Sequence, residues 1–150
     1  MDMFSKKVWA KIIPSKEAVQ VKNFLLDWKR NNLDNLNLPY NFPVNLQHDN
    51  GNEFFASIVR DFIVDNNWRF IRSSVCHPQG QGMIERWHGT MKSHLNNSIN
   101  QSELNRVVEL YNNYIYHCAT KELPNVVWYN CVTKYYGKYI LFFNNFISIY

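Results

Sequence analysis

Two carboxylates in this chain have the spacing and neighbours that suit phosphoryl-transfer chemistry. Asp49 follows a short extended stretch and opens an Asp-Asn-Gly turn, Glu85 follows a glycine-rich loop, and 35 residues lie between them. One carboxylate at the end of a strand and another near the start of a helix can meet in space and bind a divalent cation. Mg²⁺ is a hard cation that prefers oxygen ligands. The pair is therefore a candidate metal site for chemistry on nucleic-acid phosphates.

Basic and polar residues near Glu85 are candidates for nucleic-acid contacts. Lys92 lies two helical turns after Glu85, where an ammonium can meet a phosphate. Arg86 and Gln81 are further candidates for such contacts. Each piece also has an ordinary structural explanation, because Asp-Asn-Gly is a common turn and a Glu followed by a Lys is usually a solvated helix face.

Other metal-ligating side chains give weaker signals. His48 and His77 flank the two carboxylates and could bind metal, although isolated histidines more often make hydrogen bonds. The cysteines, Cys76, Cys118 and Cys131, are irregularly spaced without a Cys-x-x-Cys pair, so neither a zinc ribbon nor a disulfide framework is indicated.

Length and composition predict one globular domain with a real core. The chain has 150 residues, of which 46% are hydrophobic, and a net charge of +4 that tolerates a polyanionic partner without proving one. The N-terminus has no signal-peptide pattern, and the apolar run near the C-terminus is too short to cross a membrane. With reduced thiols, this favours an intracellular protein, in the nucleus or the cytoplasm.

Strand and helix patterns alternate along most of the chain, which predicts a layered α/β domain. Pro14 should end the first strand and Ser15 should cap the first helix, while the fourth helix should begin at Ser102 and stop before Pro124. Residues 73–82 should form a polar loop, and the aromatic end, 135–150, resists assignment. The expected strands are 8–13, 44–48 and 68–71, and the expected helices cover 15–28, 54–62, 84–95 and 102–115.

Several motifs together resemble one family. They are Asp49-Asn50-Gly51, the segment His77-Pro78-Gln79-Gly80-Gln81-Gly82-Met83-Ile84-Glu85-Arg86, Met91-Lys92, Tyr111-Asn112, His117, Thr120 and Pro124. On these motifs, residues 2–124 resemble the catalytic core of retroviral and retrotransposon integrases. The resemblance implies a ribonuclease-H-like α/β fold, a mixed sheet flanked by helices.

The resemblance also implies an activity. It implies Mg²⁺- or Mn²⁺-dependent 3′-end processing and strand transfer of DNA, carried out by a multimer. Asp49 and Glu85 would be the second and third members of the acidic triad, and Lys92 would match a lysine that contacts DNA.

The first triad carboxylate has no clear counterpart. Asp2 is the one acid near the start, yet its segment resembles the turn that follows the outer strand of the family's first hairpin. On this alignment the opening strand lies before residue 1, so the sheet should lack a strand and leave an unpaired edge. We therefore expect residues 1–124 to be an incomplete, catalytically defective core of transposable-element origin, followed by a divergent extension, 125–150. The alternative is a domesticated non-catalytic module for nucleic-acid binding or protein interaction.

Overall fold

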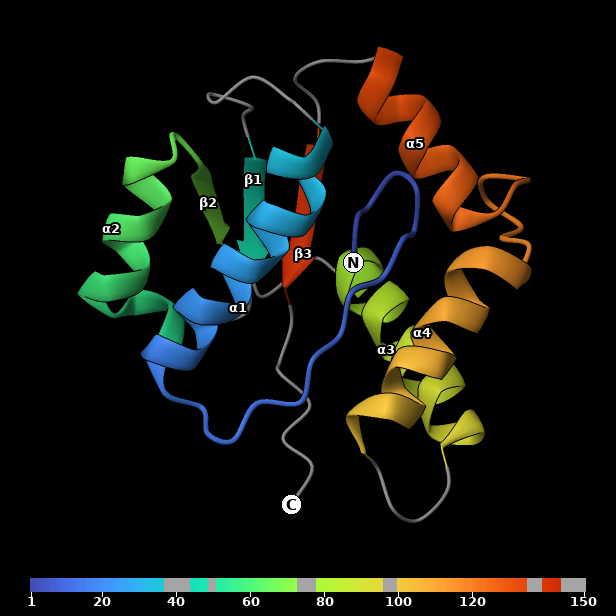
Figure 1. Cartoon of the computed structure of the whole chain (residues 1–150), viewed down its shortest axis with the longest axis horizontal. Helices are drawn as coiled ribbons and strands as arrows, with labels where there is room; N and C mark the ends of the chain where they lie inside the picture. Colours follow the sequence, from blue (N-terminus) through green and yellow to red (C-terminus); the bar gives the residue numbers. More distant parts are fainter. Residues whose placement is uncertain (37–43, 49–50, 73–77, 96–99, 135–138, 144–150) are drawn as a thin grey trace.

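The computed structural model describes residues 1–36, 44–48, 51–72, 78–95, 100–134 and 139–143. Within them a small parallel sheet lies among helices (Figure 1), which confirms the expected fold class, although the sheet is parallel where a mixed one was expected. Figure 1 shows α1 in front of the sheet, α2 beside β2, and α3, α4 and α5 grouped on the side of β3. No helix in the described ranges is long and apolar enough to span a membrane.

The sheet has the order β2-β1-β3. The central strand β1 (Val44–His48) is the strand expected before Asp49, and β2 (Arg69–Arg72) lies one residue later than its predicted range. β3 (Tyr139–Phe143) comes from the unassigned aromatic end and pairs in parallel with β1 along its whole length. β1 therefore has a neighbouring strand on both sides, and the described sheet ends in β2 and β3. A run of apolar residues such as 139–143 suits a strand of a parallel sheet.

α1 (Ala18–Asn32) covers the sheet with the apolar face that the sequence predicts. Val21 and Leu25 are fully buried and Trp28 is nearly so. The helix begins at Ala18 with Glu17 in the N-cap position and no side-chain cap bond, so the expected Ser15 cap is wrong. A short 3₁₀ turn, η1 (Asp34–Leu36), follows α1.

The second predicted helix is split in two. A 3₁₀ turn, η2 (Asn52–Phe55), precedes α2 (Ser57–Asp65), because Ala56 adopts an extended conformation between them. The split lets the Phe54 ring pack inside, stacked on His48 with ring centroids 4.9 Å apart.

Three helices form the other side of the molecule: α3 (Pro78–His94), α4 (Gln101–Tyr114) and α5 (Pro124–Lys134). α3 begins within the predicted loop, since proline is favoured in the first turn of a helix. Asn100 caps α4 by accepting the Glu103 N–H at 2.9 Å, so the expected Ser102 cap is wrong by two positions. α5 starts the predicted extension and contributes Trp128 and Cys131 to the main core.

The segment Val8–Ile13 is not a strand, which corrects the first strand prediction. Its alternation is nevertheless real: Val8, with Ala10 and Ile12, packs in the cluster between α3 and α4, while Trp9 packs in the main core. The segment lacks strand assignment because no neighbouring strand pairs with it in the described chain. Side-chain pattern alone thus predicted its two faces but not its hydrogen bonds.

Lys7 is buried between the N-terminal segment and α5. Its ammonium lies 5.3 Å from the ring centroid of Trp9, 5.6 Å from that of Trp128 and 4.9 Å from that of Tyr129. The rings offset part of the cost of burying the charge. Burial still lowers the pKa of Lys7 from 10.5 to about 8.

We expect Lys7→Met to change how stability depends on pH. Between pH 8 and 10.5 the unfolded chain binds more protons at this lysine than the folded one, so stability rises with pH there. Below pH 8 both states are protonated and the cost of the buried charge is fully present. Lys7→Met should therefore gain stability at pH 7 and lose the rise between pH 8 and 10.5, measured by thermal unfolding across this range. Lys16→Met, at an exposed lysine, is the control; an unchanged pH profile in Lys7→Met would contradict the expectation.

Candidate nucleic-acid interface

α3 presents one face to the core and the opposite face to solvent. Ile84, Trp87 and Met91 are buried, in the pattern that the sequence predicts. Glu85 and Arg86 are exposed, and so is Lys92. Three of the predicted site residues therefore lie on the accessible side of a single helix.

The pKa of His88 depends on the charged residues along this side of α3. Burial lowers its pKa, the positive charges of Lys92 and the N-terminal amine lower it further, and the Glu85 carboxylate opposes them. Glu85 and Lys92 thus act on the same imidazole from its two sides along the helix. Glu85, His88 and Lys92 therefore lie near one another along one side of α3.

A second group of positive charges gathers at the first half of α3. The pKa of His117 is lowered by burial, and then by the charges of Lys6 and Arg86. Lys6 has a left-handed backbone (φ 66°), and its ammonium donates to the Met3 carbonyl and lies 3.0 Å from the Met83 sulfur. This contact brings the N-terminal loop onto α3. Sequence reasoning did not single out Lys6, because its position beside Arg86 is produced by tertiary packing between residues 80 positions apart.

The remaining predicted residues are placed less completely. Asp49 lies outside the described residues; it follows directly after His48, the last residue of β1. Gln81 belongs to α3, and its side chain is outside the described part. Asp2 is fully buried, and its Oδ2 accepts the Ser5 N–H at 2.7 Å and the Ser5 hydroxyl at 2.6 Å. Its role is to close a turn in the N-terminal loop.

The described residues do not assemble a metal site. No group of three or more His, Cys, Asp or Glu side chains that could hold a cation occurs among them. His48 is buried among the rings of Phe54, Phe55 and Phe70, and His77 lies outside the described residues. Of the predicted carboxylate pair, Glu85 alone is in view, exposed to solvent.

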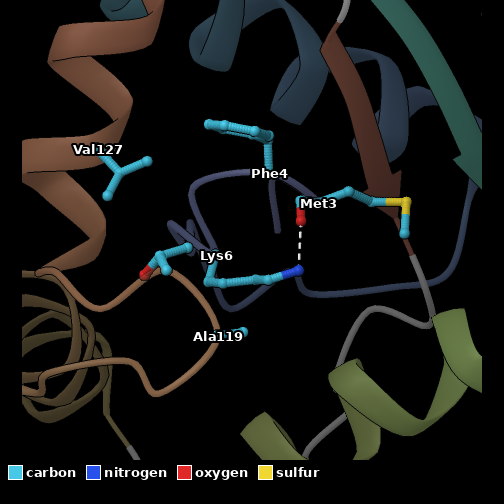
Figure 2. A pocket seen from close by; sticks show the side chains of 6 residues that line it. Met3, Phe4, Lys6, Ala119 and Val127 are labelled. Carbon is cyan, nitrogen blue, oxygen red and sulfur yellow. Dashed lines mark hydrogen bonds between the residues drawn. The ribbon is translucent and has the colours of Figure 1, made fainter.

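A cavity of about 370 Å³ lies between the N-terminal loop and the chain that leads into α5 (Figure 2). It is lined by Met3, Phe4, Lys6, Ala119, Thr120 and Val127. Figure 2 shows the Lys6 ammonium directed to the Met3 carbonyl, and the lining is mixed, with polar side chains from Lys6 and Thr120. Of the predicted site residues that the structure describes, Glu85, Arg86 and Lys92 do not line it; they lie on the surface of α3.

Comparison with known proteins finds solved structures with a similar fold. No protein-family model and no curated protein matches the chain. Among solved structures, the catalytic core domain of BIV integrase is 21% identical, with a TM-score of 0.68, over 87% of this chain and 84% of that one. The HTLV-2 integrase catalytic core domain, solved with magnesium in a trimeric form, is 16% identical, with a TM-score of 0.54, over 75% and 70%.

A third structure is larger than this chain. In the simian T-cell lymphotropic virus intasome, bound to PP2A regulatory subunit B56 gamma, the match is 14% identical with a TM-score of 0.61. It covers 77% of this chain and 41% of that one. The chain has the fold of retroviral integrase catalytic core domains.

Proposed function

We propose that this chain is an integrase-core-like protein of transposable-element origin that binds DNA through the solvent face of α3 and is defective in catalysis. The observation that supports it is the row of Glu85, His88 and Lys92 along a helix of an integrase-core fold, in which Glu85 and Lys92 are exposed and His88 is half-buried. Lys92, Arg86 and Gln81 are the proposed DNA contacts that come from the sequence. Lys6 extends the positive surface at the first half of α3, and its charge and that of Arg86 lower the pKa of His117.

Phosphate contacts account for the proposed affinity. Lysine and arginine side chains supply most of the sequence-independent attraction to DNA, and this attraction weakens as salt rises. Lys92 and Arg86 are exposed, so a phosphate can reach both without a rearrangement of the core. The Lys92 ammonium also lies in the last turn of α3, where the helix dipole favours a cation.

We propose the catalytic defect because the number of candidate catalytic carboxylates is smaller than in the family's triad. Asp49 and Glu85 are two carboxylates where the family's triad has three, and Asp2 is engaged in a buried turn. The proposed cofactor is Mg²⁺ or Mn²⁺ on Asp49 and Glu85, a cation that carboxylate oxygens suit. The magnesium in the HTLV-2 core structure is that protein's, and it supports the proposal by analogy of fold alone.

We expect Lys92→Glu to weaken DNA binding by about tenfold or more and to reduce the salt slope by about one phosphate contact. Fluorescence anisotropy with a short duplex, at several salt concentrations, measures both quantities. Lys16→Glu makes the same charge change at an exposed lysine outside α3 and should cost far less. Equal losses in the two variants would show a general charge effect and contradict a site on α3.

A second assay separates binding from chemistry. Strand transfer of preprocessed DNA ends with Mn²⁺ should give no joining, and the double variant Asp49→Asn, Glu85→Gln is measured beside the original chain for DNA binding. Robust joining that Glu85→Gln abolishes would overturn the proposed defect. Unchanged binding by the double variant without any joining favours the second candidate, a domesticated binding module.

The proposal also covers the association of copies, the C-terminal extension and the location of the protein. We propose that copies of the chain associate, as the trimeric form of the HTLV-2 core and the viral intasome do in their own proteins. We propose that residues 125–150 are a divergent extension of the integrase-like core sequence. In the folded chain, Trp128 of this extension packs in the main core. We place the protein inside the cell, in the nucleus or the cytoplasm, which suits Cys118 and Cys131, since neither forms a disulfide among the described residues.

A further inference from the structure

The turn formed by residues 2–7 makes one wall of the cavity in Figure 2. In its backbone, the Asp2 N–H donates to the Lys7 carbonyl at 2.8 Å and the Lys6 N–H donates to the Asp2 carbonyl at 3.0 Å. The Asp2 carboxylate accepts the N–H and the hydroxyl of Ser5 at 2.7 and 2.6 Å. Phe4 lies within this turn and is 59% exposed. Because the bonds that close the turn are local, they hold Phe4 in place beside the cavity.

The other wall of the cavity comes from the chain that leads into α5 and from α5 itself. Ala119 and Thr120 lie before this helix, and Val127 lies within it. Figure 2 shows the side chains of Phe4, Val127 and Lys6 on different sides of the space. The volume of about 370 Å³ is near the lower end of the range for small-molecule sites, roughly 300–1,000 Å³. The cavity therefore suits a group of the size of one nucleobase.

Three basic side chains from three parts of the chain gather beside the cavity: Lys6, Arg86 and His117, which we call the basic cluster. The Lys6 ammonium lies 3.0 Å from the sulfur of Met83, one turn before Arg86 in α3. Burial lowers the pKa of Lys6, the charge of Asp2 opposes this, and the charge of Arg86 lowers the pKa further. Burial also lowers the pKa of His117, followed by the charges of Lys6 and Arg86. The members of the cluster thus repel one another, and none of them forms an ion pair with a carboxylate among the described residues.

The basic cluster has donors to offer an anion. The His117 Nδ1 accepts the Ala119 N–H at 3.3 Å, which leaves the proton of the neutral imidazole on Nε2. The Arg86 Nε donates to the Gly82 carbonyl at 3.2 Å, and the two terminal nitrogens of this exposed guanidinium have no hydrogen-bond partner in the described part of the chain. A phosphate at this position would accept charge-assisted hydrogen bonds and relieve the repulsion within the cluster.

We propose that the cavity and the basic cluster together bind one unpaired nucleotide of a DNA strand, with the base against Phe4 and the phosphate at the cluster. Proteins that bind single strands combine a basic groove with aromatic side chains, because every base has a face that stacks. Lys6 joins the two halves of the site, since its side chain lines the cavity and its ammonium belongs to the cluster. The inference rests on the proposed DNA binding and adds to it a preference for unpaired bases.

A nucleotide is favoured over an acidic peptide because an acidic peptide would neutralise the basic cluster but would bring no aromatic face to Phe4. The experiment with Lys92→Glu uses duplex DNA, in which the bases are paired and none is free to enter the cavity. Duplex binding that depends on Lys92 can therefore persist when the present inference fails. Loss of the Lys92 effect would instead contradict the proposed function.

Fluorescence anisotropy of the full chain tests the proposal with two single strands of the same length and charge, an oligothymidine and an abasic strand. We expect the oligothymidine to bind about fivefold more tightly or better, because the abasic strand has no base to stack. Phe4→Ala should remove this preference and leave the affinity for the abasic strand unchanged. Phe55→Ala makes the same change at a phenylalanine that is 45% exposed outside the cavity, and it should keep the preference.

Three outcomes of this experiment would overturn the proposal. The first is equal affinity of the original chain for the two strands. The second is a preference for oligothymidine that Phe4→Ala retains or that Phe55→Ala removes equally. The third is polyglutamate of the same charge that binds as tightly as oligothymidine, which would show that the ligand is an acidic chain and not a nucleotide.

Titration of the histidine rings by NMR gives a second test on the unmodified chain. A phosphate at the basic cluster offsets the positive charges of Lys6 and Arg86, so thymidine monophosphate should raise the pKa of His117. Thymidine without the phosphate should leave this pKa unchanged, and His94 at the exposed end of α3 is the internal control. No rise at His117, or an equal rise at His117 and His94, overturns the placement of the phosphate at the cluster.

Discussion

Replacing Trp128 with alanine is expected to lower the free energy of unfolding by about 3–5 kcal/mol, the usual cost of truncating a buried tryptophan. Trp128 is 1% exposed, and its ring lies 5.0 Å from that of Trp9 in an edge-on arrangement. The loss compares with a total stability of roughly 5–15 kcal/mol for a typical domain. The variant should therefore be marginally folded, as urea unfolding followed by circular dichroism will show.

The control for Trp128→Ala lies two residues away on the same helix. Val126 is 39% exposed, so Val126→Ala should change stability by no more than about 0.5 kcal/mol. The comparison asks whether the extension is part of the folding unit. A loss below about 1 kcal/mol in Trp128→Ala would show that α5 docks weakly on a core that is stable without it.

Replacing Asn112 with alanine is expected to cost about 2–3 kcal/mol, because two hydrogen bonds disappear and two buried main-chain groups lose their partner. Asn112 is 5% exposed, and its amide binds both the N–H and the C=O of Val8. The Val8 amide should then exchange faster, and the N-terminal segment should detach from α4 before the rest unfolds.

Two further variants sharpen the Asn112 experiment. Asn105→Ala removes an exposed asparagine from the same helix and should be nearly neutral. Asn112→Asp keeps an acceptor for the Val8 N–H but places a carboxylate against the Val8 carbonyl, so it should also be destabilised. If Asn112→Ala were as stable as Asn105→Ala, the segment would be held by side-chain packing alone.

Local patterns in the sequence predicted the elements that depend on local periodicity. The strand before Asp49 and the buried faces of α1 and α3 follow from apolar spacing, and the structure has them where they were expected. The cap of α4 was missed by two residues, because Asn100 and Ser102 are both good cap residues and the sequence does not rank them. The exposed residues Glu85 and Lys92 were found because a single helix face fixes their relation.

Three features were decided by tertiary structure. β3 pairs with β1 across more than 90 residues of chain, and periodicity carries no information about which strands pair. Val8–Ile13 has a strand's alternation, yet it binds α4 through Asn112 and Gln101 in place of a neighbouring strand. Lys6 joins Arg86 and His117 because the N-terminal loop folds onto α3.

The sequence by itself thus determined the carboxylate pair, the helix and strand beside it, and the resemblance to integrase catalytic cores. The tertiary structure decided which segments pack together: a strand from residues 139–143 beside β1, a buried Asp2, and an N-terminal loop folded onto α3. One physical cause separates the features that the sequence predicts from those that tertiary structure decides. Side-chain periodicity records which face of an element is buried, whereas pairing and burial of particular groups depend on residues far away along the chain.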